Sequence, residues 1–168
     1  MVSVYLALGS NLGDRVANLR ATISALAPQV RVQRLSPVYE TSPMYVVDQP
    51  HFLNMAIAGE TAVGPADLLT FVKIIEADLG REPGLRFGPR QIDIDILFYG
   101  DAVLALPGLD IPHPRLAERA FVLRPLADIA SERDHPVLRR TVADLLADLN
   151  DHEPLVRHAV DPPLEIAA

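Results

Sequence analysis

Two aspartates interrupt the stretch GPRQIDIDILFYG, residues 88–100, which otherwise has the composition of a buried strand. In an extended chain, one face carries large apolar side chains: Ile92, Ile94, Ile96 and Phe98. The opposite face carries Asp93 and Asp95, flanked by Gln91 and Leu97. The α-carbons of the two aspartates are then about 6.5 to 7 Å apart. The pattern predicts a strand with a carboxylate pair on one face.

Such a pair calls for a compensating cation. At this separation the two charges repel each other by about 2 to 3 kcal/mol at an effective dielectric constant near 20. Hard carboxylate oxygens without a nearby histidine or cysteine favour Mg²⁺ over Zn²⁺, and Mg²⁺ completes its octahedron with water and phosphate oxygens. The alternative is a structural ion-pair network with neighbouring arginines, or a solvent-facing side of the sheet. The pair alone does not decide between them.

The preceding loop, GREPGLRFGPR at 80–90, favours a phosphate ligand. It contains Arg81, Arg86 and Arg90, and guanidinium groups match phosphate oxygens bidentately. A loop rich in Gly and Pro is also able to close over a ligand and exclude water. A nucleoside triphosphate with Mg²⁺ is therefore the expected ligand. The sequence has neither a P-loop nor a G-x-G-x-x-G dinucleotide motif.

The elements that must position these residues alternate between strands and helices. Strands are expected over residues 2–10, 30–41 and 52–61, where Pro37 indicates an edge or a bulge in the second. Helices are expected over residues 13–27 and from about Pro65 to Leu79. Residues 101–114 are expected to form a hairpin with the aspartate strand, and two closing helices are expected over 116–130 and 141–150.

The order β-α-β-β-α-β predicts an α+β fold of the ferredoxin-like type, with a mostly antiparallel sheet covered on one face by two helices. The C-terminal helices are then available for the other face. A length of 168 residues with 49% hydrophobic composition fits one domain. We expect that domain to span residues 1–150, followed by a C-terminal tail at 151–168.

Composition excludes several classes of function. A formal net charge of -7 argues against a general nucleic-acid binder. There is no cysteine for disulfide or thiol chemistry, and no apolar run is long enough to cross a bilayer. The amino terminus also lacks the pattern of a signal peptide. We expect a soluble, cytoplasmic protein with no nucleic-acid or membrane partner.

Four blocks of sequence together resemble a known family. They are LALGSNLGDR near the start, YETSPM followed by DQPHFLNMAI, then GPRQIDIDILFYG, and finally IPHPRLAERAFVLRPL. In this order and spacing they resemble the hydroxymethyl-dihydropterin pyrophosphokinases of folate biosynthesis, over roughly residues 2–130. The resemblance implies a ferredoxin-like monomer that transfers the pyrophosphoryl group of ATP to the hydroxymethyl group of a reduced pterin, releases AMP and uses two magnesium ions.

The same resemblance implies roles for individual residues. Asp93 and Asp95 would hold the two Mg²⁺ ions. The residues implied for the pterin are Thr41, Met44, Phe52, Asn54 and Phe121. Those implied for ATP are Glu76, Arg81, Arg90, Ile96, His113 and Arg119. Arg81, Arg86 and Arg90 would act in catalysis, with Arg86 and Phe87 in the catalytic loop.

The chain also departs from the family pattern. Its arginine loop is short, Pro83-Gly84 stands where a second basic residue is frequent, and Phe87 replaces a frequent tryptophan. Lys73 and Pro114 stand where a glutamine and an aromatic residue are often found, so their roles stay open. Two other functions also remain open: an ATP-binding ferredoxin-like sensor without turnover, and a kinase that releases ADP. No residue is an evident general base, and a loose phosphoryl-transfer transition state does not require one.

Overall fold

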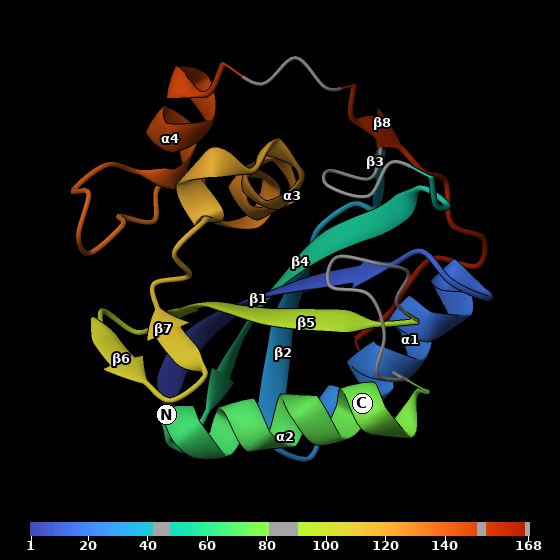
Figure 1. The fold of residues 1–168 in the computed structure, drawn as a ribbon, viewed down its shortest axis with the longest axis horizontal. Coiled ribbons are helices and arrows are strands. Elements are labelled where there is room, and N and C mark those ends of the chain that lie inside the picture. Colours follow the sequence, from blue (N-terminus) through green and yellow to red (C-terminus); the bar gives the residue numbers. More distant parts are fainter. Residues whose placement is uncertain (42–47, 81–90, 151–153, 167–168) are drawn as a thin grey trace.

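The computed structural model describes residues 1–41, 48–80, 91–150 and 154–166. Its main sheet has the strand order β5-β1-β4-β3-β8, with β2 also paired to β4, and every pairing is antiparallel (Figure 1). The strands are β1 (Val2–Ser10), β2 (Val30–Leu35), β3 (Tyr39–Thr41), β4 (Phe52–Thr61), β5 (Asp93–Tyr99) and β8 (Val156–Arg157). A separate two-stranded sheet joins β6 (Leu104–Leu106) to β7 (Leu109–Ile111). The expected α+β class with a mostly antiparallel sheet is confirmed, and the strand order is consistent with the ferredoxin-like arrangement.

Helices cover both faces of the sheet. They are α1 (Arg15–Leu26), α2 (Pro65–Asp78), the short 3-10 helix η1 (Leu116–Glu118), α3 (Ala120–Ala130) and α4 (Val142–Asp148). Helices α1 and α2 pack with the isoleucine face of β5 in one apolar core, while α3 and α4 pack against the other face in a second core (Figure 1). Asp14 caps α1 by accepting a hydrogen bond from the Ala17 amide, and Pro65 occupies the first turn of α2.

Three sequence expectations are corrected by the structure. The single strand expected over 30–41 is two strands, β2 and β3. The Ser36 amide still donates to the Ala56 carbonyl, but the Ser36 hydroxyl accepts from the Ala56 amide and Pro37 has no N–H to continue the ladder. The hairpin expected between residues 101–114 and β5 does not form, since β6 and β7 pair with each other instead. Phe98 does not lie with the isoleucines: a bulge at the β1–β5 pairing turns it into the core under α3.

The C-terminal segment returns to the sheet. Strand β8 pairs with β3, and Arg20 of α1 donates hydrogen bonds to the carbonyls of Pro162 and Pro163. Val160 and Leu164 pack against the core that lies under α1. Within the described residues, no helix combines the length and the apolar character needed to cross a membrane.

Candidate active site

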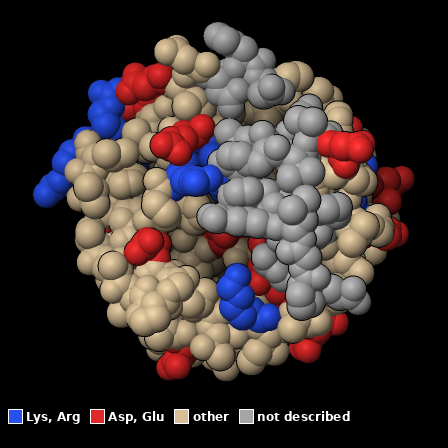
Figure 2. Space-filling view, in the orientation of Figure 1, with Lys and Arg blue, Asp and Glu red and all other residues tan. Residues whose placement is uncertain are grey.

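Asp93 and Asp95 lie on the sheet face that carries α3, at the end of that face which α3 does not cover. Their neighbours on β1 are Gly9 and Ala7 respectively, and the next positions on β4 are Asn54 and Ala56. Three of these four neighbours are Gly or Ala, so few side-chain atoms stand on the sheet beside the carboxylates. Figure 2 shows acidic side chains at the edge of a hollow near the middle of the viewed face, with basic side chains above and below. The register therefore places the two carboxylates beside small residues on one face of the sheet.

The carboxyl group of Asp95 is held in a costly environment. Burial, and secondarily the neighbouring Asp93, raise the pKa of Asp95 to about 7, although Arg119 opposes the shift. A bound cation would stabilise the ionised form of Asp95 against both effects. Among residues outside the gaps at 42–47, 81–90 and 151–153, no group of three or more His, Cys, Asp or Glu side chains is placed to hold a metal ion. Two carboxylates alone fit Mg²⁺, which leaves most of its ligand positions to water and phosphate, better than they fit Zn²⁺.

Glu76 anchors α2 to the start of the aspartate strand. Its side chain is 1% exposed, and its Oε2 accepts a hydrogen bond of 2.8 Å from the Ile94 amide, the residue between the two aspartates. Its Oε1 pairs with the Lys73 ammonium at 3.0 Å. Burial raises the pKa of Glu76, and these two partners oppose that shift. Lys73, the single lysine of the chain, thus stands beside the carboxylate pair. Ile96, the other residue implied for the nucleotide pocket, is 4% exposed in the core under α1 and α2.

His113 faces the same carboxylates from the segment before η1. Its amide donates to the Leu97 carbonyl, and its Nδ1 accepts from the Arg115 amide at 3.2 Å, so the proton of the neutral ring lies on Nε2. Nε2 is 3.9 Å from Oδ1 of Asp95. Burial, and secondarily the charge of Arg119, lower the pKa of His113 to about 4. His113 is therefore a neutral N–H donor directed at the carboxylate pair at physiological pH.

Arg119 precedes α3 and lies close enough to influence both Asp95 and His113. Its guanidinium carbon is 5.5 Å from the ring centroid of Phe121. Because α3 begins directly after this residue, Phe121 lies in its first turn, next to the Arg119 guanidinium. The helix thus supplies a positive charge and an aromatic ring to the same region.

A polar group suited to a heterocycle lies on the other side of Gly9. Asn54, 8% exposed, donates from Nδ2 to the Thr41 hydroxyl at 2.7 Å. A β-carbon added at Gly9 would stand 2.9 Å from Oδ1 of Asn54 and 3.5 Å from Cδ1 of Phe52. Gly9 on β1 thus lies between Asp93 on β5 and Asn54 on β4. The strand spacing puts Asp93 and Asn54 about 10 Å apart across the sheet. Phe52 and Phe121 are both half-buried.

Sequence reasoning missed three residues that organise this region. Gly9 was assigned no role in the site. Arg15 donates from Nη1 to Glu40 at 2.8 Å and to the His51 carbonyl at 3.0 Å, and Asn11, which is 1% exposed, donates to the Pro50 carbonyl at 2.9 Å. These contacts join segments 25 to 39 residues apart, which no local pattern signals. Five predicted residues lie outside the described part of the chain: Met44, Arg81, Arg86, Phe87 and Arg90.

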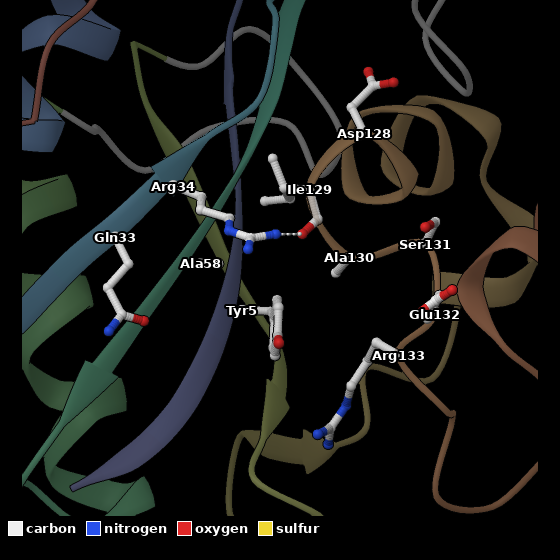
Figure 3. A pocket seen from close by; sticks show the side chains of 10 residues that line it. All are labelled: Tyr5, Gln33, Arg34, Ala58, Asp128, Ile129, Ala130, Ser131, Glu132 and Arg133. Atoms are coloured by element: carbon white, nitrogen blue, oxygen red, sulfur yellow. Dashed lines mark hydrogen bonds between the residues drawn. The ribbon is translucent and has the colours of Figure 1, made fainter.

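A cavity of about 440 Å³ lies farther along the same sheet face, near the C-terminal end of α3 (Figure 3). Its walls include Tyr5, Arg34 and Arg133. Both arginines are engaged, since Arg34 donates to the Ile129 carbonyl at 3.0 Å and Arg133 pairs with Asp101 at 3.1 Å. None of the site residues predicted from the sequence lines this cavity, so it is separate from the candidate active site.

Comparison with known proteins decides the family. Residues 5–131 match the sequence model of the 7,8-dihydro-6-hydroxymethylpterin-pyrophosphokinase (HPPK) family. This chain belongs to that family. The 2-amino-4-hydroxy-6-hydroxymethyldihydropteridine pyrophosphokinase of Bacillus subtilis is 44% identical over 130 residues, covering 76% of this chain and 78% of the relative. The protein of the same name from Aquifex aeolicus is 38% identical over 144 residues, covering 86% and 90%.

Members of the family also occur inside longer proteins. The mitochondrial folate synthesis bifunctional protein of Arabidopsis thaliana is 50% identical over 127 residues, which cover 75% of this chain and 23% of that protein. The chain thus spans about a quarter of the length of the bifunctional relatives it matches. The crystal structure of Plasmodium falciparum HPPK-DHPS with pteroate superposes with a TM-score of 0.74 at 18% identity, covering 87% of this chain and 44% of the other. At that identity the likeness establishes the fold.

Proposed function

We propose that this chain transfers the pyrophosphoryl group of ATP to the hydroxymethyl group of 6-hydroxymethyl-7,8-dihydropterin and releases AMP, a step of folate biosynthesis. One observation carries the proposal: Gly9 has a carboxylate of the Asp93–Asp95 pair on one side and the Asn54–Thr41 hydrogen bond on the other. A phosphate–metal site and a site for the polar edge of a heterocycle are therefore adjacent. Family membership and the names of relatives with matching length support the same reaction.

Asp93 and Asp95 would hold two Mg²⁺ ions. The fit rests on the raised pKa of Asp95, on the two carboxylates sharing one face, and on the small residues beside them, which leave room for water and phosphate ligands. When bound, the ions would supply positive charge that offsets the negative charge developing as AMP leaves. The chain itself contributes the position of the carboxylates, fixed by the Glu76 contact to the Ile94 amide.

The nucleotide would lie between α2 and the segment before α3. His113 would offer its Nε2–H as a neutral donor and Arg119 a full positive charge, so both would favour phosphate oxygens. Glu76 would act by holding β5, and Ile96, whose side chain lies in the core under α1 and α2, would line the pocket through its backbone alone. Arg81, Arg86 and Arg90 stay predicted phosphate contacts from the arginine loop.

The pterin would lie beside Gly9. With Nδ2 of Asn54 committed to Thr41, its Oδ1 is the atom left to accept from a donor on the pterin ring edge. Phe52 and Phe121 would stack on the ring faces, and the Met44 backbone would complete the polar contacts.

No dedicated general base is proposed. His113, neutral with its Nδ1 occupied by an amide, is not placed to accept a proton from the pterin hydroxyl. In a loose transition state the attacking hydroxyl loses its proton late, so positioning and electrostatics carry most of the rate. In the complex with both substrates, the protein would mainly serve to align the hydroxymethyl oxygen of the pterin with the phosphorus atom of ATP that it attacks.

The family match favours this enzyme over an ATP-binding sensor without turnover. We also propose that the chain acts as a monomer on small molecules and that it works in the cytoplasm.

The decisive experiment separates the nucleotide products formed from ATP, Mg²⁺ and the pterin by chromatography. We expect AMP, and only when the pterin is present. ADP would indicate an ordinary kinase, and ATP binding without any product would indicate the sensor.

A paired substitution tests the carboxylates. Asp95→Asn should remove most of the turnover, by about 100-fold or more, because it deletes a charge at the site of metal and phosphate binding. Asp67→Asn, the same change at an exposed position at the start of α2, should leave turnover within twofold. Near-normal turnover in a folded Asp95→Asn variant would refute the metal assignment.

A further inference from the structure

The strand that carries Thr41 is only three residues long. Strand β3 pairs through one edge with β4, where Tyr39, Glu40 and Thr41 lie opposite Asn54, Leu53 and Phe52. A strand this short has few ladder hydrogen bonds of its own. Its other edge is covered by β8, with Tyr39 opposite Arg157 and Glu40 opposite Val156. The His158 amide extends the ladder by donating to the Val38 carbonyl at 2.8 Å.

Strand β8 comes from a part of the chain that the family match does not include. That match ends at residue 131, and β8 begins at Val156. The segment after β8 is held to α1 by Arg20, which donates to the Pro162 carbonyl at 2.8 Å and to the Pro163 carbonyl at 3.3 Å. The C-terminal segment is thus attached at two places, and β3 lies between β8 and β4 (Figure 1).

The position of β3 determines how Asn54 presents its amide. An asparagine side chain exposes an acceptor and a donor that exchange places when the amide turns by half a rotation. The Thr41 hydroxyl accepts from Nδ2 at 2.7 Å, and this contact places Oδ1 over Gly9, where an added β-carbon would be 2.9 Å away. If β3 frayed, Thr41 would move and Asn54 would lose the contact that orients it.

A second contact joins the same strand to the start of β4. Arg15 donates to Glu40 of β3 at 2.8 Å and to the His51 carbonyl, immediately before Phe52, at 3.0 Å. Any displacement of Glu40 would therefore also disturb His51, the residue that precedes Phe52. Both contacts of Arg15 lie on the side of Gly9 away from Asp93. They are therefore next to the proposed pterin site and not next to the proposed phosphate site.

We propose that β8 is a positioning strand for pterin recognition: by pairing with the outer edge of β3, it fixes Thr41 and hence the amide orientation of Asn54. This inference rests on the proposed function, because it assigns Asn54 to the pterin edge. The selective effect distinguishes it from a general contribution to stability. Loss of the β3–β8 pairing weakens pterin binding and leaves nucleotide binding unchanged.

Two substitutions at one position test the pairing. His158→Pro removes the N–H that donates to the Val38 carbonyl, whereas His158→Ala keeps it. Dissociation constants are measured by calorimetry, for the pterin in the presence of Mg²⁺ and a non-hydrolysable ATP analogue, and for the analogue alone with Mg²⁺. We expect His158→Pro to weaken pterin binding by about 5- to 20-fold, with analogue binding within twofold, and His158→Ala to keep both within twofold. Hydrogen exchange at the Thr41 and Asn54 amides should quicken in the Pro variant only.

Several results would overturn the inference: unchanged pterin affinity in His158→Pro, equal weakening of both ligands, or an Ala variant as weak as the Pro variant. A wild-type protein that binds the analogue but no pterin would refute the proposed function itself, and the inference with it. Failure of the proposed function would therefore be seen in the wild-type protein, and failure of the inference alone in the variants. If His158→Pro does not fold, Arg20→Ala takes its place, with Arg31→Ala as control. Arg31 is exposed and pairs with Glu60 on β4, and the same selective loss of pterin affinity is expected only for Arg20→Ala.

Discussion

Among single residues, Asp95 is where stability and function oppose each other. The pKa of Asp95 is about 7 in the folded protein and near 3.8 in an unfolded chain. Below the lower value both states are protonated; as the pH rises from about 4 to about 7, the unfolded chain ionises first and the metal-free fold loses stability. The carboxylate thus costs free energy of folding at neutral pH, where a metal ion would need it ionised.

Asp95→Asn should therefore stabilise the metal-free protein at pH 8. Asp95 is about one-third exposed, so solvent screening reduces the gain to about 1 to 2 kcal/mol, or roughly 3 to 6 °C in melting temperature. The measurement is thermal unfolding of both proteins in EDTA from pH 4 to pH 8. The difference should grow across that range, and a difference independent of pH would contradict the raised pKa of Asp95.

Gly9 is the second residue with a specific steric demand. Gly9→Ala places a β-carbon 2.9 Å from Oδ1 of Asn54 and 3.5 Å from Phe52, so both side chains must shift. We expect pterin affinity to fall about tenfold, equivalent to about 1.4 kcal/mol, while nucleotide affinity holds. Calorimetry with each ligand measures this. Gly64→Ala is the control, because nothing lies within 4 Å of a β-carbon added there; equal affinities in both variants would remove Gly9 from the pterin site.

At this scale the sequence revealed the residues whose signal is local. Asp93 and Asp95 stand out because a period of two places both on one strand face, and the observed register keeps them there. Gly9, Asn11 and Arg15 did not stand out, because their roles depend on Asn54, Pro50 and His51, which follow them by at least 36 residues. Contacts at that distance follow from strand pairing and are absent from any short window.

Among the elements, periodicity and capping predicted α1, α2 and α4 well, whereas the single helix expected over 116–130 is divided into η1 and α3 at Arg119, whose backbone is extended. Helix α2 was expected from about Pro65 to Leu79 and spans Pro65–Asp78, because Pro65 and Gly80 mark its ends. The errors fall where a ladder is interrupted. Pro37 was recognised as a disturbance, but the bond from the Ala56 amide to the Ser36 hydroxyl, which replaces a backbone acceptor at the break, is a tertiary contact. The bulge that reverses Phe98 likewise depends on its pairing with Tyr5.

The connection between α3 and α4 depends on Arg133. Its guanidinium donates to the Gly100 carbonyl, pairs with Asp101, and lies 5.1 Å from the Phe98 ring centroid and 5.6 Å from that of Tyr5. Arg133→Ala should cost about 2 to 3 kcal/mol, since it removes a charged hydrogen bond, ring contacts and buried side-chain area.

Denaturant unfolding measures this cost. Arg140→Ala is the control, because Arg140 is 47% exposed and pairs with Asp148 at the surface, which predicts a loss under about 1 kcal/mol. Equal losses in the two variants would show that the ring and carbonyl contacts of Arg133 contribute nothing beyond a surface ion pair.

In the whole molecule, the two faces of the sheet have different roles. The face under α1 and α2 is closed by a continuous apolar core, whereas α3 and α4 cover only part of the other, leaving the end that bears Asp93, Asp95 and Asn54 for ligands. Ligand binding at that end is therefore linked to the free energy of unfolding of the entire domain.

This linkage predicts how Mg²⁺ and ATP act on the folded chain. A ligand at 100 times its dissociation constant adds about 2.7 kcal/mol, or roughly 5 to 10 °C in melting temperature for a chain of this size. We expect that shift with ATP and Mg²⁺ together and a much smaller one when EDTA removes the metal. Asp95→Asn should lose the Mg²⁺-dependent part while Asp67→Asn keeps it. An equal shift with and without Mg²⁺ would mean that arginines alone hold the triphosphate, and the carboxylate pair would then have to be explained without a metal.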